Sequence, residues 1–170
     1  AEYYATKVPD SGGVSLVPAF TGLGAPYWDM YARGAILGLT RGATKAHLAR
    51  AALEGIAYQV ADLVSTMEKD LGRPLDSLWV DGGASVSNFL MQFQADLLRC
   101  SIYRPKMVET TAAGAAYLAG LATGLWESTD EILQNRQLES VFAPKMSPEQ
   151  AQDYLKCWHR AVARSLRWEE

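Results

Sequence analysis

The sequence has 170 residues, of which 49% are hydrophobic and 21% charged, as in an ordinary soluble domain that buries a sizeable core. Sixteen basic and nineteen acidic residues leave a net charge of −3, which gives no electrostatic reason to expect nucleic acid or anionic membrane as a partner. The two cysteines, Cys100 and Cys157, lack the spacing of a disulfide framework or a zinc site.

No apolar run reaches the roughly 20 residues that cross a bilayer, and the first residues do not resemble a signal peptide. These features predict a cytoplasmic protein without a membrane span. The chain starts at Ala1 without a methionine and runs directly into AEYYATKVPDSGGVSLVPAF, which predicts a fragment of a longer protein.

The first expected elements are a short strand, Val14 to Val17, and a long loop, AFTGLGAPYWDMYARGA, that follows Pro18. The loop mixes glycine and proline with bulky aromatic residues, so we expect an ordered loop that folds onto the body. Packing is the favoured role of its aromatic side chains, and stacking on a base or covering a ligand is the alternative.

A helix is predicted from Thr44, its N-cap, to about Glu68, with Gly72 and Pro74 closing the segment. Large apolar residues recur along it at helical spacing and predict its buried face: Leu48, Ala52, Ile56, Val60, Leu63 and Met67. Small residues broaden that face, so that another element can approach closely: Ala49, Ala51, Gly55, Ala57 and Ala61.

Strands and helices then alternate, which is typical of an α/β domain with a partly parallel sheet. The expected units are a strand at Leu78 to Val80, a helix capped by Ser85 and running to Arg99, a strand at Ser101 to Arg104, and a helix at Thr111 to Thr123 that Gly124 stops. The strands are fewer than the roughly five or six of a usual sheet, so the predicted sheet is incomplete.

The last helix is predicted from Pro148 to Trp168. One of its faces is an apolar stripe, made by Leu155, Trp158, Val162 and Leu166, and another is a basic row, made by Lys156, Arg160, Arg164 and Arg167. A solvated face is the favoured interpretation of the basic row, with binding of phosphate or nucleic acid as the alternative.

The segment DGGASVSN, Asp81 to Asn88, is the first candidate for chemistry. A strand that ends in glycines and opens into a helix offers main-chain N–H groups at the positive end of the helix dipole, where a nucleotide can approach closely. Tight turns also need glycine for structural reasons alone, so the motif by itself leaves both interpretations open.

Three long blocks of the sequence resemble the glycerol kinases, a branch of the FGGY carbohydrate-kinase family. They are Val17 to Gln59, Asp81 to Leu98 and Tyr103 to Trp126, and they follow in order over nearly the whole chain. Within the first block, GAILGL, seven residues and HLARAALE match the second signature of the family. The loop sequence PAFTGLGAPYWD favours glycerol among the family's substrates.

The resemblance implies a two-domain enzyme with ribonuclease H-like, actin-type ATPase domains, in which residues 1–170 form most of the C-terminal, nucleotide-binding domain. It implies phosphorylation of glycerol to glycerol 3-phosphate by ATP with Mg²⁺, and homodimers or homotetramers. The catalytic base and the glycerol ligands of the family lie N-terminal to these residues, so no catalytic or metal-binding residue is assigned, and the fragment alone is expected to be inactive.

The nucleotide contacts that the resemblance implies fall on the glycine turn and on the residues that follow it: Gly82, Gly83, Ala84 and Ser87. Many glycerol kinases carry two consecutive asparagines where this sequence has Ser87 and then Asn88. A side-chain contact from Ser87 must therefore be shorter or bridged by water, and the backbone contact at Gly83 is the firmer expectation.

Four other polar residues are interpreted structurally. Asp29 is expected to fix its loop by hydrogen bonds, and Asp81 to order the glycine turn through its own backbone. His47 and His159 are expected in capping or surface roles rather than as metal ligands, because no cysteine or carboxylate cluster accompanies them in the sequence.

Two alternatives to a glycerol kinase remain open at this point. One is a kinase of the same family that acts on another polyol or sugar, and the other is a nonenzymatic actin-like binding module. All three share a fold, so the site has to decide between them.

Overall fold

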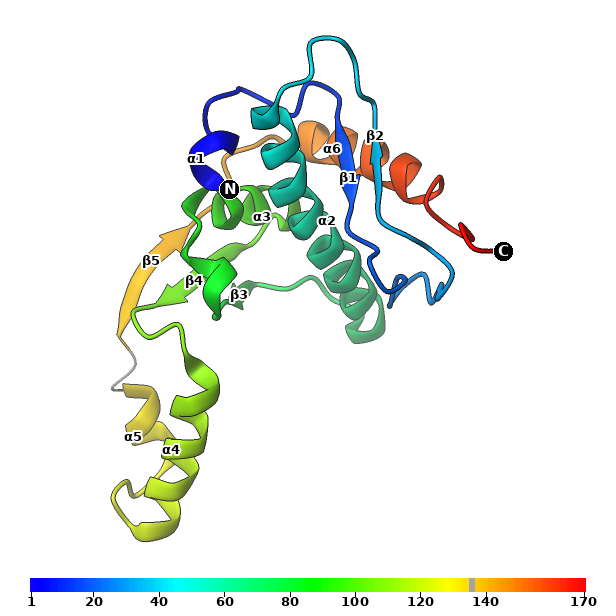
Figure 1. Cartoon of the computed structure of the whole chain (residues 1–170). Helices are drawn as coiled ribbons and strands as arrows, with labels where there is room; N and C mark the ends of the chain where they lie inside the picture. The colour runs from blue at the N-terminus through cyan, green and yellow to red at the C-terminus, as the bar shows by residue number, and fades with distance from the viewer. Residues whose placement is uncertain (135–136) are drawn as a thin grey trace.

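The computed structural model describes residues 1–134 and 137–170. Figure 1 shows a compact body from which one pair of helices projects. The elements in chain order are α1 (Glu2–Ala5), β1 (Ser15–Val17), β2 (Ala35–Leu37), α2 (Lys45–Leu71), β3 (Ser77–Trp79), the 3₁₀ turn η1 (Gly83–Val86), α3 (Asn88–Leu98), β4 (Ser101–Pro105), α4 (Thr110–Thr123), α5 (Thr129–Gln134), β5 (Leu138–Phe142) and α6 (Pro148–Val162).

The strands form two small sheets. β1 and β2 pair antiparallel, whereas β3, β4 and β5 form a second sheet in that order, with β3 parallel and β5 antiparallel to β4. The partly parallel sheet is confirmed. β2 and β5 were not predicted, because each is short and partly exposed and neither shows the clean alternation of apolar and polar residues that marks a half-buried strand.

Helix α2 begins and closes at the predicted residues, but only part of its predicted face is buried. Thr44 and His47 form a capping box, and Gly72 closes the helix in the left-handed conformation with φ 68°. Three of the predicted large residues, Ile56, Leu63 and Met67, are exposed, whereas Leu48 and Val60 are half-buried. The buried side carries most of the small residues together with three larger ones: Ala51, Gly55, Ala57 and Ala61, with Leu53, Tyr58 and Val64.

Close packing against strand β1 explains this choice of face. A Cβ atom at Gly55 would lie 2.4 Å from the carbonyl oxygen of Leu16, so no side chain fits between α2 and the strand. Ala57 and Ala61, on another side of the helix, are buried in the core. Backbone contact at this distance requires small residues, and larger ones are excluded from the interface.

The N-cap of helix α3 differs from the prediction. Ser85 does not cap a helix: it is buried, and its hydroxyl donates to the carbonyl oxygen of Gly82 over 2.7 Å. Ser87 is the N-cap of α3, because its Oγ accepts from the amide of Leu90 at 3.2 Å. The 3₁₀ turn η1, which begins at Gly83, therefore lies between Gly82 and the helix.

The final helix is shorter than predicted. α6 ends at Val162, and turns follow, so the predicted end at Trp168 is wrong. Its apolar stripe does pack inward, with Trp158 1% exposed and stacked on Tyr58 at a ring distance of 5.2 Å. The basic row faces solvent as predicted.

Helices α4 and α5 project from the body (Figure 1), attached where β4 ends and β5 begins. α4 matches the predicted helix, and Gly124 closes it with φ 76°. Its sequence, TTAAGAAYLAGLAT, is apolar on every side, yet Leu118 is 71% exposed. A helix that is apolar all round is normally buried, so the surface of α4 is suited to a partner.

Candidate functional site

The two glycines that follow β3 have different roles. Gly82 has a φ of 77°, which an L-residue rarely adopts, and its amide donates to the carbonyl oxygen of Val108 over 2.7 Å. Gly83 has no such constraint, and a Cβ atom built on it would meet nothing within 4 Å. Gly82 therefore shapes the turn, whereas Gly83 leaves an open, solvent-exposed backbone surface.

Two amides in the first turn of helix α3 are already paired, contrary to the simplest expectation for this motif. The amide of Phe89 donates to the Glu2 carboxylate over 2.7 Å, and that of Leu90 to Ser87. The open backbone belongs to η1, which starts at Gly83 and includes Ala84. The first amides of a helical turn have no acceptor within it, so a phosphate group could accept hydrogen bonds there.

The side chains around the turn are divided between buried and exposed. Ser87 is 9% exposed, and its oxygen is occupied by capping, although its hydroxyl proton can still be donated. Asn88 is exposed at the first position of α3, and its Oδ1 accepts from Arg104 over 2.9 Å. Asp81 is exposed, and within the described ranges its carboxylate accepts no hydrogen bond, so the structure does not support its predicted role in ordering the turn.

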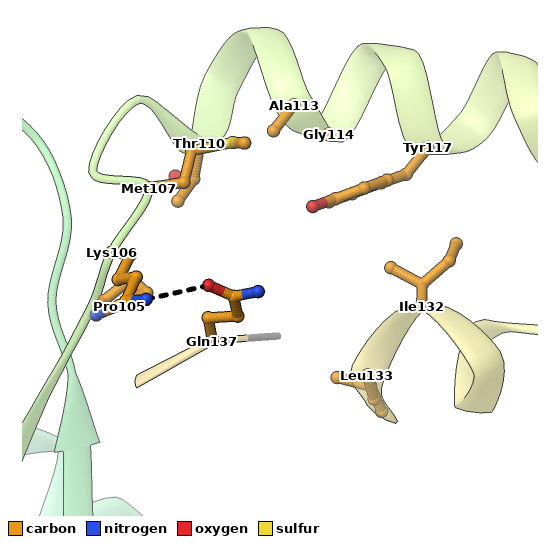
Figure 2. Close-up of a pocket in the computed structure, with 10 residues that line it drawn as sticks. All are labelled: Pro105, Lys106, Met107, Thr110, Ala113, Gly114, Tyr117, Ile132, Leu133 and Gln137. Carbon is orange, nitrogen blue, oxygen red and sulfur yellow. Dashed lines mark hydrogen bonds between the residues drawn. The ribbon is translucent and has the colours of Figure 1, made fainter. Parts of the chain in front are cut away.

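A cavity of about 570 Å³ lies beside the segment that the turn contacts. Figure 2 shows it between α4, α5 and the exit from β4, with Tyr117 and Ile132 on facing helices. Val108, which accepts from Gly82, adjoins its lining residue Met107. The cavity has a mainly apolar lining: Pro105, Lys106, Met107, Thr110, Ala113, Gly114, Tyr117, Ile132, Leu133 and Gln137.

The predicted role of Asp29 is confirmed. Its Oδ1 accepts from the amides of Tyr31 and Ala32, and its Oδ2 from that of Arg167, which ties the loop to the end of the chain. Desolvation alone would raise the pKa of Asp29, but these donors outweigh it and hold the pKa below its ordinary value. The expected packing of the loop aromatics is wrong for Trp28, which is 80% exposed with a φ of 50°, and for Tyr31, which is 44% exposed.

Asp62 is a buried polar residue with three side-chain partners that sequence reasoning missed. It lies on α2, is 7% exposed, and accepts from the hydroxyl of Tyr27 at 2.7 Å and from Nε1 of Trp158 at 2.6 Å. His159 Nε2 lies 2.8 Å from its other oxygen. Burial raises the pKa of Tyr27, and Asp62 raises it further. The sequence did offer one sign of this role: Asp62 lies one helical turn after Tyr58, so it falls on the same side of α2 as that residue.

Neither histidine belongs to a metal site in the part of the chain that the structure describes. Within residues 1–134 and 137–170 there is no group of three histidine, cysteine, aspartate or glutamate side chains able to hold a metal ion. Nδ1 of His47 accepts a hydrogen bond from the backbone amide of Thr44, which is the expected capping role. None of the described helices is both long and apolar enough to cross a membrane.

The match to a family model identifies the class of this domain as a carbohydrate kinase. Residues 2–123 match the model of the FGGY family of carbohydrate kinases, C-terminal domain, and the chain belongs to this family. The predicted fold class is confirmed, because the structural neighbours are kinases of this family with the actin-like ATPase fold.

The chain is similar to glycerol kinases in both sequence and structure. The chain is 60% identical over 169 residues to the glycerol kinase of Alkaliphilus oremlandii, a match that covers 99% of this chain and 34% of that protein. The crystal structure of Plasmodium falciparum glycerol kinase with ADP superposes with a TM-score of 0.87 at 37% identity, over 97% of this chain and 33% of the other.

The chain is also similar to a sugar kinase, with a lower TM-score and a lower sequence identity. Ligand-bound xylulose kinase from Lactobacillus acidophilus gives a TM-score of 0.77 at 31% identity, over 99% of this chain and 35% of the other. The chain thus spans about a third of the length of the relatives that it matches.

Proposed function

We propose that this chain is the nucleotide-binding part of a kinase that transfers a phosphoryl group from ATP to glycerol and forms glycerol 3-phosphate. The observation that carries the proposal is the 60% identity to a glycerol kinase across nearly the whole chain. The loop sequence GLGAPYWD, which favours glycerol, is held in place by Asp29 and by the contact of Tyr27 with Asp62.

The proposed nucleotide contacts are Gly82, Gly83, Ala84 and Ser87. Open backbone at Gly83 and Ala84 suits the phosphates of ATP or ADP, which Mg²⁺ would accompany and partly neutralise. The solved glycerol kinase with ADP supports nucleotide as the ligand of this fold. Ser87 can contribute a hydroxyl proton while its oxygen caps α3.

Residues 1–170 form most of the C-terminal domain in this proposal. The remaining two thirds of such an enzyme would supply the catalytic base and the glycerol ligands, and its subunits would assemble as homodimers or homotetramers in the cytoplasm. Support comes from α4, whose exposed apolar surface, together with the cavity in Figure 2, offers area for further chain to cover.

Activity of the complete polypeptide tests the function. With ATP and Mg²⁺, we expect phosphorylation of glycerol with kcat/KM at least about a hundredfold above that for xylulose, because a site built for one polyol leaves polar groups unpaired with another. Preference for xylulose would favour the second candidate, a sugar kinase, which the similarity to xylulose kinase supports. Absence of nucleotide binding and of turnover would favour a nonenzymatic module.

The 170-residue chain alone is expected to show no phosphorylation of glycerol, even at high protein concentration. Phosphoryl transfer needs a group that orients or deprotonates the acceptor hydroxyl, and the proposal places that group in the other domain. A coupled assay for ADP release, in the presence and absence of glycerol, measures this. Glycerol-dependent turnover by the chain alone would contradict the proposed division of labour.

Replacing Leu118 with aspartate should affect the stability of the isolated chain and of the complete polypeptide differently. In the chain alone, the exposed position predicts a change in unfolding free energy within about 0.5 kcal/mol. In the complete polypeptide, a covered α4 predicts a loss of about 2 kcal/mol or more, because a charge would be buried without a partner. Equal small effects in the two proteins, measured by urea unfolding, would show that α4 stays uncovered.

A further inference from the structure

A buried cation lies directly behind the glycine turn. Arg104, on β4, is 5% exposed. Its Nη1 donates to the carbonyl oxygen of Ser85 over 2.8 Å, its Nη2 to Oδ1 of Asn88 over 2.9 Å, and its Nε to the carboxylate of Glu139 over 2.7 Å. One guanidinium therefore connects η1, the first residue of α3 and strand β5.

This contact fixes the orientation of the Asn88 amide. A guanidinium has donors and no acceptor, so the Asn88 atom that faces it must be the oxygen. The NH₂ group is then the part of the amide that does not contact Arg104, and Asn88 as a whole is exposed. Across residues 1–134 and 137–170, no acceptor within hydrogen-bond distance takes up this NH₂ group.

Asn88 is the polar side chain next to the open backbone of the turn. Ser87 is buried, and its oxygen is committed to Leu90, whereas Asn88 is exposed and its donor is free in the described structure. Arg104 holds both the Asn88 side chain and the carbonyl of Ser85, so the donor and the turn keep a fixed relative position. A fixed donor loses little freedom when it binds a ligand.

We propose that the amide nitrogen of Asn88 donates a hydrogen bond to the bound nucleotide, and that Arg104 is the positioning residue that presents it. The inference rests on the nucleotide site proposed above. Lysine cannot replace Arg104 in this role, because a single ammonium cannot reach three acceptors in the fork geometry of a guanidinium.

The test uses the complete polypeptide and calorimetric titration with MgADP. Asn88→Asp keeps an oxygen toward Arg104, replaces the donor by a second carboxylate oxygen and adds negative charge beside the phosphates. We expect binding about tenfold weaker or more, with an unchanged melting temperature. In the kinase assay, KM for ATP should rise while KM for glycerol stays constant, a split that a purely structural defect would not produce.

Arg104→Lys tests the positioning role. It should weaken MgADP binding as well, and the double variant should bind no more weakly than Asn88→Asp alone, because both changes remove the same donor. If Arg104→Lys fails to fold, the Asn88→Asp result alone decides the contact. Gln152→Glu, which adds the same charge on the exposed face of α6, is the matched control and should bind like the parent.

The outcomes separate this inference from the proposed function. Binding by the parent together with unchanged binding by Asn88→Asp would overturn the contact and leave the nucleotide site intact. Fully additive losses in the double variant would overturn the positioning role of Arg104. Failure of the complete parent to bind MgADP would overturn the proposed function, and this inference with it.

Discussion

Gly83→Val is expected to weaken MgADP binding by at least about a hundredfold, or ~2.7 kcal/mol, in the complete polypeptide. The structure separates this effect from misfolding. A Cβ atom at Gly83 would meet no protein atom within 4 Å, and the residue does not require a positive φ. The valine side chain therefore projects into the space that the proposal assigns to the nucleotide, and calorimetry measures the loss.

Gly42→Val is the matched control for this measurement. Its nearest neighbour would be Oγ1 of Thr40 at 3.8 Å, an ordinary contact, and it lies in the turn before α2. It should bind MgADP like the parent. Gly82→Val is not equivalent, since the φ of 77° adds backbone strain that would confuse folding with binding. Parent-like affinity of Gly83→Val would place the nucleotide elsewhere.

Asp62→Ala is expected to lower the unfolding free energy of the chain by about 3 kcal/mol, the largest stability effect that we anticipate. The substitution leaves Nε1 of the buried Trp158 and the hydroxyl of Tyr27 without their acceptor. It also releases the loop from α2 and α6 at one point. Denaturant unfolding should show a lower midpoint with an unchanged slope.

Asp153→Ala provides the comparison for Asp62. Asp153 pairs with Lys156 on the surface of α6, where both side chains are more than 70% exposed, so its loss should change stability by less than about 0.5 kcal/mol. Tyr27→Phe should remove part of the Asp62 effect, and the double variant should show coupling between the two residues. A stability change for Asp62→Ala as small as that for Asp153→Ala would contradict the anchoring role.

Local signals explain which elements could be predicted from the sequence. α2 and α4 were located well because Thr44, Gly72 and Gly124 act through their own backbone and nearest neighbours. The end of α6 at Val162 was missed because the apolar stripe continues to Leu166. The spacing of apolar residues does not show where the helix gives way to turns.

The buried face of α2 depended on information that periodicity does not contain. The helix carries a face of large apolar residues and a face of small ones, and either pattern alone predicts burial. Tertiary packing decided between them, since β1 approaches Gly55 more closely than any side chain allows, while Ile56, Leu63 and Met67 stay exposed. The formation of strands β2 and β5 likewise depended on their partners β1 and β4, because short strands gain most of their stabilisation from pairing.

The sequence by itself determined the family resemblance, the glycine turn at Gly82 and Gly83, and the local part of the loop-fixing role of Asp29, because the turn and the contacts with Tyr31 and Ala32 involve residues close in sequence. The contact of Asp29 with Arg167, 138 residues away, needed the folded chain. The tertiary structure alone decided the contacts of Arg104 with Asn88, 16 residues away, and of Asp62 with Trp158, 96 residues away. A hydrogen bond depends on distance in space, and only the folded chain brings residues so far apart in sequence within about 3 Å of each other.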